Sequence, residues 1–266
     1  MSLKHFEKNI SSQFGEDGVI EEIFKRIGIQ NKLCVEFGAW DGLHLSNAWN
    51  LWNNYKWEAL LIEGDSNKFN TLKENTKSHS NVSALNAFVT TDGENSLDEI
   101  FNRLSLRSDI DLLSIDIDGD DYYIFESLKK YRPRLILVEY NPSIPPDLDI
   151  VQTKGEYFGC SALALYNLGH LKDYKLIHMT DTNMFFVRSE DFDKLKIDEQ
   201  ELKQLFPKKY LTNVITSYNG SAFLTRVPVY MDPLKKENRK STKLPLKAAD
   251  LPHLIPVTIL GKNIEK

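Results

Sequence analysis

Apolar runs and helix-like runs alternate along the first 190 residues, and this alternation is the strongest constraint on the fold. Short apolar runs typical of buried strands occupy residues 33–37, 58–65, 82–89, 111–118 and 134–140. Stretches with apolar residues at helical spacing separate most of them. This order predicts an α/β fold in which a doubly wound, Rossmann-like parallel sheet is covered by helices.

The expected helices share an amphipathic pattern. The clearest spans residues 15–28, with acids early, Lys25 and Arg26 late, and Gly28 as a stop signal. Further helices are expected over residues 45–57, 66–77, 96–106, 120–131 and 160–174. The apolar runs 175–179 and 184–187 flank a short polar turn and predict a hairpin.

The pattern changes after Arg188. Residues 190–206 predict a short helix, and residues 234–247 form a basic, polar run that we interpret as a solvated linker. The apolar tail at 251–262 could pack on the domain or against a second copy, so a homodimer is compatible with the sequence. We divide the chain into a domain over 1–190, which includes the N-terminal helix, and a C-terminal extension over 191–266.

Net charge, hydropathy and cysteine content bear on the partners and the location of the protein. A net charge of −5 and a pI near 5.7 leave no general electrostatic footprint for nucleic acid. The sequence shows neither the apolar core of a signal peptide nor a membrane-spanning run, so we expect a cytoplasmic protein. Cys34 and Cys160 lie among apolar or small residues, and we expect both to be buried free thiols.

The first strand ends in a glycine-bearing turn, Glu36-Phe37-Gly38-Ala39-Trp40-Asp41-Gly42. Gly38 permits a tight turn, and Gly42 allows close approach of the backbone to a ligand or of a helix to the sheet. The spacing is not the G-x-G-x-x-G pattern of dinucleotide-binding proteins, which weakens a dehydrogenase interpretation.

The turn resembles the glycine motif of class I S-adenosylmethionine-dependent methyltransferases, in which an acid precedes glycines at alternate positions. Trp40 stands in place of the middle glycine. Further stretches follow in register: SQFGEDG at 12–18, LLIEGD at 60–65, DLLSIDIDGDDY at 111–122 and LILVEYNP at 135–142. Together, over residues 11–190, they resemble the FkbM-like methyltransferase group.

The resemblance implies the strand order 3-2-1-4-5-7-6 with an antiparallel last strand, and S-adenosyl-L-methionine as cofactor. Glu63 would accept hydrogen bonds from the ribose hydroxyls, and Phe88 and Val89 would contact the adenine. The polar lead-in at 12–17 is interpreted equally well as a helix cap or as a ligand contact. The expected cofactor-binding residues are Gln13, Glu36, Gly38, Ala39, Asp41, Gly42, Glu63, Gly64, Phe88, Val89 and Asp116.

Acids end two strands that this order makes neighbours. Asp116 and Asp118 end the fourth strand, and Glu139 and Asn141 end the fifth. Asn183, in the hairpin turn, could approach the same edge. Three roles remain open for these acids. Asp116 could bind the amino group of the cofactor, Asp118 or Glu139 could accept a substrate proton, or the acids could hold a divalent metal, which their spacing does not require.

The leading hypothesis is an O-methyltransferase with Asp116, Asp118 and Glu139 as catalytic residues. The resemblance implies a small-molecule or carbohydrate-linked acceptor from glycan, capsule or natural-product pathways. A narrower resemblance is to bacterial methyltransferases that complete the O-methyl phosphoramidate group of capsular polysaccharide. The rivals are another nucleotide-binding enzyme, such as a dehydrogenase, and a non-catalytic methyltransferase-like module.

Aromatic and histidine side chains complete the set of candidates. Tyr122, Tyr123, Tyr140 and Tyr157 could line an acceptor pocket, although the first two also suit core packing. For His44 and His178 a structural role is the default, because neither has a partner identifiable from the sequence.

Overall fold

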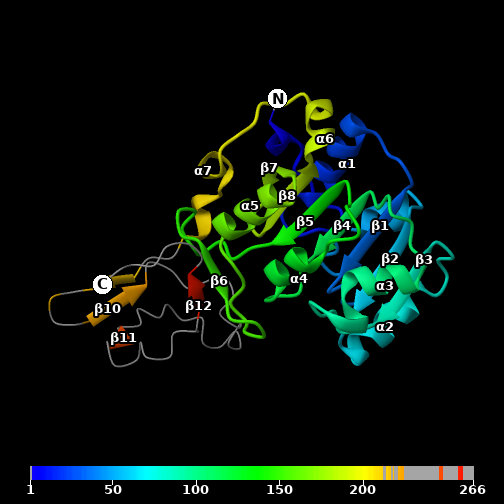
Figure 1. The fold of residues 1–266 in the computed structure, drawn as a ribbon, viewed down its shortest axis with the longest axis horizontal. Helices are drawn as coiled ribbons and strands as arrows, with labels where there is room; N and C mark the ends of the chain where they lie inside the picture. The colour runs from blue at the N-terminus through cyan, green and yellow to red at the C-terminus, as the bar shows by residue number, and fades with distance from the viewer. Residues whose placement is uncertain are drawn as a thin grey trace.

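A seven-stranded sheet forms the centre of the protein (Figure 1). The computed structural model describes residues 2–211, 214–216, 218, 221–224, 246–247 and 257–259. The strands of the sheet are β1 Leu33–Phe37, β2 Glu58–Glu63, β3 Val82–Asn86, β4 Leu112–Ile115, β5 Leu135–Glu139, β7 Tyr174–Met179 and β8 Asn183–Arg188.

The strand order in space is β3-β2-β1-β4-β5-β8-β7. Strands β1 to β5 pair in parallel, whereas β8 runs antiparallel to both β5 and β7. The short β6 (Ile150–Gln152) lies outside this sheet, so β7 and β8 correspond to strands six and seven of the expected order. The predicted topology, including the antiparallel last strand and the hairpin, is confirmed.

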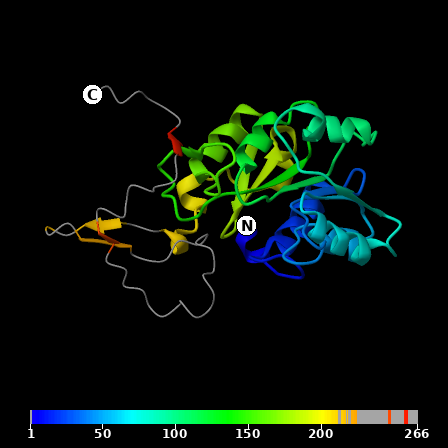
Figure 2. The same ribbon diagram turned by 90° about the horizontal axis from the view of Figure 1, so that it is seen from below.

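Helices cover both faces of the sheet, as the turned view in Figure 2 shows. One face carries α1 (Glu16–Ile27) and α2 (Ser66–Thr76). The other carries α3 (Leu97–Arg103), α4 (Asp121–Ser127) and α5 (Ala162–Leu171). Successive side chains of a strand point to opposite faces of the sheet, so each strand contributes residues to two separate hydrophobic cores.

The helix predicted over residues 45–57 is confirmed only in part. The structure has a turn there, followed by a short π-helix over Asn50–Asn54, in which the Tyr55 N–H donates to the Asn50 carbonyl. Polar groups of this segment are bonded elsewhere, since the Asn47 N–H donates to Glu36 and the Asn50 amide to Glu21. Asparagine is also a weak helix former, so apolar spacing alone did not decide the structure.

The C-terminal extension is partly described. Its predicted helix at 190–206 is instead split into α6 (Ser189–Phe192) and α7 (Leu202–Leu205). Leu195, Leu202 and Phe206 are buried in the cores of the domain. The short strands β9 (Val214–Thr216), β10 (Ser221–Leu224) and β11 (Leu246–Lys247) form an antiparallel sheet, and β12 (Val257–Ile259) pairs with β6.

Most of the predicted linker and apolar tail lies outside the described residues, so the division of the chain at residue 190 stays a prediction. Both cysteines are buried and free, as expected. Among the described residues, no helix is long and apolar enough to cross a membrane.

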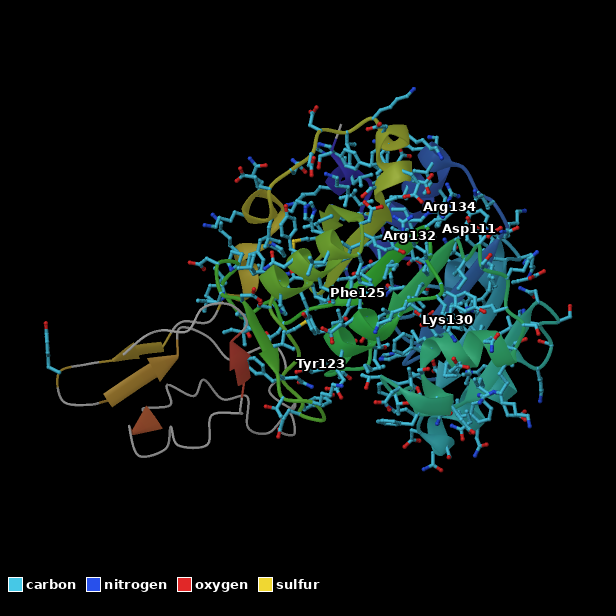
Figure 3. All side chains as sticks on the ribbon, viewed as in Figure 1. Asp111, Tyr123, Phe125, Lys130, Arg132 and Arg134 are labelled. Atoms are coloured by element: carbon cyan, nitrogen blue, oxygen red, sulfur yellow. The ribbon has the colours of Figure 1, made fainter. Side chains whose placement is uncertain are left out.

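A buried arginine ties together the amino-terminal end of the sheet. Arg134, at the start of β5, is labelled beside Asp111 in Figure 3. Its guanidinium contacts Asp111 Oδ1 at 3.0 Å and Asp191 Oδ2 at 3.1 Å, and it donates to the carbonyls of Ile27 and Gly28. These contacts join α1, the start of β4, the start of β5 and α6 at the edge opposite the carboxyl ends of the parallel strands.

Candidate active site

A cavity of about 680 Å³ lies at the carboxyl edge of the sheet. The turns after β1, β2, β3 and β4 line it, together with the end of β5 and the segments 13–14 and 155–157. Most predicted site residues meet there: Gln13, Glu36, Gly38, Ala39, Glu63, Gly64, Phe88, Val89, Asp116, Asp118 and Glu139. Asp41 and Gly42 are not among the lining residues.

The turn after β1 places three residues, Gly38, Trp40 and Gly42, in the left-handed region. Gly38 has φ +73°, and a Cβ there would lie 1.7 Å from the carbonyl oxygen of Asp116. Only glycine therefore fits between β1 and β4 at this point. Trp40, in place of the family's middle glycine, has φ +49°. A left-handed conformation costs a residue with a side chain about 1–2 kcal/mol.

Asp41 and Gly42 shape this turn from outside the cavity. Asp41 Oδ1 accepts the N–H groups of Leu43 and His44 at 2.9 and 2.7 Å. A Cβ on Gly42 would lie 2.7 Å from Leu72 of α2, so glycine permits close packing of helix on turn. Their proposed contact with the cofactor stays a prediction.

Glu63 presents a nearly buried carboxylate to the cavity, with 6% of its surface exposed. Oε2 accepts the Trp40 N–H at 2.8 Å, and Oε1 accepts the Asp65 N–H at 2.7 Å. Each carboxylate oxygen can accept a further hydrogen bond, so Glu63 suits two vicinal hydroxyl donors such as those of a ribose.

Phe88 offers an aromatic surface beside Glu63. The residue is 75% exposed, and a Cβ placed on Gly64 would lie 3.1 Å from its ring. An exposed ring in a cavity suits a flat ligand such as adenine. Together, the glycine turn, the Glu63 carboxylate and the Phe88 ring fit an S-adenosyl group.

Glu36 supports the turn from below. Ser46 Oγ donates to Oε2, and the Asn47 N–H donates to Oε1 at 2.7 Å. Burial raises the pKa of Glu36 from 4.5 to about 7, although the hydrogen bonds from Ser46, Asn47 and Ala48 oppose this shift. Between these two pKa values the folded protein keeps a proton that the unfolded chain releases.

Glu36 therefore makes the protein less stable as pH rises from about 4.5 to 7. Between these pH values, Glu36 should lower the free energy of unfolding by roughly 2–3 kcal/mol, and replacing it with glutamine should abolish this decrease. Urea unfolding of both proteins at several pH values measures it. The exposed Glu126→Gln variant is the control and should keep the wild-type slope. A Glu36→Gln slope as steep as the wild type would contradict the burial argument.

The segment before α1 reaches the cavity through two residues. Asp17 accepts the N–H groups of Ile10, Ser11 and Ser12 and the Ser12 hydroxyl, which fixes the path of the chain. Gly15 is the N-cap of α1 and makes no side-chain cap. Gln13 and Phe14 line the cavity, so the segment is placed for ligand contact. Ser12 Oγ also accepts the Asp17 N–H at 3.1 Å in the first turn of α1, so the segment caps the helix as well.

Three carboxylates gather where β4 and β5 end. One oxygen from each of Asp116, Asp118 and Glu139 lies within 4.8 Å of the other two, which would also allow them to share a divalent ion. Burial, followed by the nearby charges of Asp121, Asp118 and Glu36, raises the pKa of Asp116 well above its usual range, while a hydrogen bond with Glu139 opposes this shift.

Asp121 fixes the turn that carries two of these acids. Its oxygens accept the N–H groups of Ile117 and Gly119, each at 2.9 Å. Burial raises the pKa of Asp121 to about 7. Asp118, between these two amides, has φ +59° and an exposed side chain that lines the cavity.

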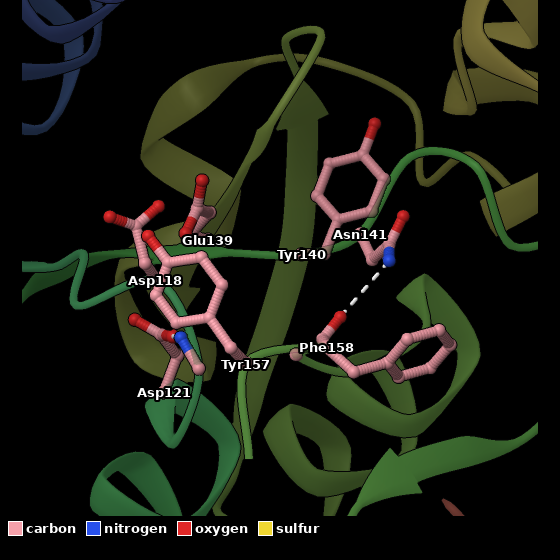
Figure 4. Close-up of a pocket in the computed structure, with 9 residues that line it drawn as sticks. Asp118, Asp121, Glu139, Tyr140, Asn141, Tyr157 and Phe158 are labelled. Carbon is pink, nitrogen blue, oxygen red and sulfur yellow. Dashed lines mark hydrogen bonds between the residues drawn. The ribbon is translucent and has the colours of Figure 1, made fainter. Parts of the chain in front are cut away.

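A smaller pocket of about 10 Å³ adjoins the acids, with room for roughly one water-sized group. Figure 4 shows the Tyr157 ring next to Asp118 and Glu139 in this pocket. Burial, followed by the charge of Asp118, a hydrogen bond with Asp118 and the charges of Glu139 and Asp116, raises the pKa of Tyr157. Of the four candidate tyrosines, Tyr157 is therefore the one whose hydroxyl group contacts the acids.

The loop that carries Tyr157 is fixed by Gln152. The fully buried side-chain amide donates to Asp120 Oδ1 at 2.7 Å and to the Glu156 carbonyl at 2.6 Å, and its oxygen accepts the Phe158 N–H. Glu156 and Phe158 belong to the loop, and Asp120 accepts the N–H of Gly155 within it. The sequence identified Tyr157 as a candidate, but the role of Gln152 was missed.

The remaining candidates lie near the acids without joining them. The Asn141 side chain donates to the Phe158 carbonyl, as Figure 4 shows, and Asn183, opposite Glu139 in the sheet, donates to Glu16. The Tyr140 hydroxyl donates to the Thr180 carbonyl, and His178 is buried on β7. Tyr122 and Tyr123 pack against the core. His44 lines the large cavity. Phe14, Leu45 and Lys68 line it too, although the sequence did not identify these three residues as candidates.

The sheet order, the glycine turn and the cavity at the carboxyl edge define a class I S-adenosylmethionine-dependent methyltransferase. Residues 52–159 match the family described as the methyltransferase FkbM domain. No curated protein matches the sequence.

Several solved structures are similar to the chain. The N-terminal domain of EvdMO1 with SAH bound is 13% identical, with a TM-score of 0.42, and the match covers 65% of this chain and 79% of that one. A SAM-dependent methyltransferase from Aquifex aeolicus is 11% identical, with a TM-score of 0.40, over 69% and 94% of the two chains.

Proposed function

We propose that the protein transfers the methyl group of S-adenosylmethionine to an oxygen atom of a glycan-, capsule- or nucleotide-linked acceptor. The observation that carries the proposal is the cluster of Asp116, Asp118 and Glu139 beside the cavity that suits the cofactor. The neighbouring pocket around Tyr157 would hold the acceptor oxygen.

The bound cofactor supplies a methyl group that is already electrophilic. The chain's own residues need to align the acceptor oxygen and remove its proton. Asp118 and Glu139 line both the large cavity and the small pocket, so either could accept that proton. Asp116 lines only the large cavity, where it could instead bind the amino group of the cofactor.

The charge of the small pocket favours a neutral acceptor. The described residues that line it include Asp118, Asp121 and Glu139 but no lysine or arginine. A hydroxyl group could donate to these acids, whereas an anionic group would be repelled. The O-methyl phosphoramidate of capsular polysaccharide thus remains a narrower proposal, and it requires a divalent ion between the acids and the acceptor.

Transfer of a labelled methyl group tests the proposal. The acceptors are UDP-glucose, UDP-N-acetylglucosamine, GDP-mannose and a phosphoramidate-bearing saccharide, each assayed with Mg²⁺ and with EDTA. We expect labelling of a hydroxyl acceptor. Labelling of the phosphoramidate that EDTA abolishes would support the narrower proposal. Methyl transfer exclusively to nitrogen or carbon atoms would contradict oxygen as the acceptor atom.

Calorimetry separates the rival functions. We expect S-adenosylhomocysteine to bind and NAD not to bind, because the turn lacks the dinucleotide glycine spacing. Binding of NAD alone would favour a dehydrogenase-like enzyme. Binding of S-adenosylhomocysteine without methyl transfer to any acceptor would favour a non-catalytic module. A cytoplasmic location and a homodimer stay predictions.

A further inference from the structure

Trp40 has a backbone conformation that its own packing does not explain. A left-handed φ is an outlier for a bulky residue, and such strain tends to persist at ligand-binding sites. The side chain is 47% exposed and belongs to neither hydrophobic core, so apolar burial within the protein does not offset the strain. Glycine would form the same turn more easily.

The contacts of Trp40 fix it in the cavity wall. Its N–H donates to Glu63, the carboxylate placed for the ribose. The Lys68 ammonium of α2 lies 4.0 Å from the centroid of one of its rings, and the His44 ring meets it edge-on at 5.2 Å. All four of these residues line the large cavity.

We propose that Trp40 is a cofactor-binding residue whose indole ring packs against bound S-adenosylmethionine while its N–H orients Glu63 toward the ribose. The inference rests on the assignment of S-adenosylmethionine as cofactor, and it does not depend on which acceptor is methylated. The indole then gains on binding the burial that it lacks in the free protein, which accounts for a tryptophan where glycine would be less strained.

Two substitutions separate the ring from the backbone. Trp40→Gly keeps the N–H that holds Glu63 and relieves the backbone strain, but it removes the indole. Trp40→Phe keeps an aromatic ring. Leu43→Ala is the matched control, because Leu43 is equally exposed at 47%, lies in the same turn and does not line the cavity.

Calorimetry with S-adenosylhomocysteine measures the result. We expect Trp40→Gly to raise the Kd about 10-fold, Trp40→Phe to raise it no more than about 3-fold, and Leu43→Ala to leave it unchanged. Thermal unfolding of Trp40→Gly should begin no lower than in the wild type, which would exclude misfolding as the cause. A Kd within about 2-fold of the wild type in Trp40→Gly would overturn the proposal.

Fluorescence provides a readout that a purely structural role would not change. Addition of S-adenosylhomocysteine should alter tryptophan emission in the wild type and in Trp49→Phe, whose indole is outside the cavity. The change should vanish in Trp40→Phe, and its persistence there would overturn the proposal. Failure of the wild type to bind S-adenosylhomocysteine would overturn both the proposal and the cofactor assignment. Normal binding without acceptor methylation would contradict the proposed function alone.

Discussion

Replacing Glu139 with glutamine is expected to lower the kcat of methyl transfer by a factor of about 10²–10⁴, the usual contribution of a positioned general base. Glu139 ends β5, lines both the large cavity and the small pocket, and lies within 4.8 Å of Asp116 and Asp118. Glutamine keeps the size of the side chain and removes its basicity. Single-turnover transfer of a labelled methyl group measures the change.

Two further variants make the Glu139 result interpretable. The exposed Glu126→Gln on α4 should keep the wild-type kcat, because Glu126 lines neither the large cavity nor the small pocket. Asp116→Asn separates two roles. A lower affinity for S-adenosylhomocysteine would assign Asp116 to the cofactor, whereas a lower kcat at unchanged affinity would assign it to the chemistry. Unchanged turnover in both Glu139→Gln and Asp116→Asn would remove these acids from the mechanism.

Replacing Arg134 with methionine should lower the free energy of unfolding by about 3–5 kcal/mol. The guanidinium is almost completely buried between Asp111 and Asp191, and its removal leaves both carboxylates without that cation. Three salt-bridge or hydrogen-bond partners of Asp191, namely Arg134, Lys194 and Arg188, hold its pKa below the usual range. Urea unfolding of the two proteins gives the difference.

Arg132→Met is the matched control for Arg134→Met. Arg132 pairs with Asp173 and Glu190, and the three side chains are 40%, 71% and 47% exposed, respectively. Exposed pairs contribute about 0–1 kcal/mol, so the control should unfold almost as the wild type does. An equal decrease in the free energy of unfolding in Arg132→Met and Arg134→Met would show that burial of the Arg134 network has no energetic consequence.

The sequence predicted the framework well where short-range patterns determine structure. In α1, acids at the start, basic residues at the end and a glycine stop agree with apolar spacing, and the helix formed where expected. The strands were equally clear because buried parallel strands are continuous apolar runs. The strand order itself came from the resemblance, since local patterns do not specify which strands pair.

Local patterns failed where side chains bond to distant groups. The Asn47 N–H bonds to Glu36 of β1 and the Asn50 side-chain amide bonds to Glu21 of α1, and a short π-helix forms in place of the longer helix expected there. Likewise, Gln152 fixes the 153–159 loop through contacts that no local periodicity records. Gly155 and Gly159, both with left-handed φ, were the available signal that this polar loop has a defined shape.

The sequence predicted which candidate residues lie close together where they stand at strand ends. Acids at the ends of β4 and β5 came together because the carboxyl ends of parallel strands share one edge. Lys68 was missed because it faces the cavity from the first turn of α2, where a lysine usually signals only a solvated helix face. Asp41 was predicted to bind the cofactor, and the structure shows its carboxylate accepting amide groups of its own turn.

A crystal structure with bound S-adenosylhomocysteine tests the central claim most directly. The ribose should lie at Glu63, the adenine beside Phe88, and the sulfur should face Asp116, Asp118 and Glu139, because the methyl group must leave toward the acceptor pocket. A ligand whose ribose lies away from Glu63, or whose sulfur faces away from the three acids, would contradict the assignment of both the cofactor cavity and the catalytic edge.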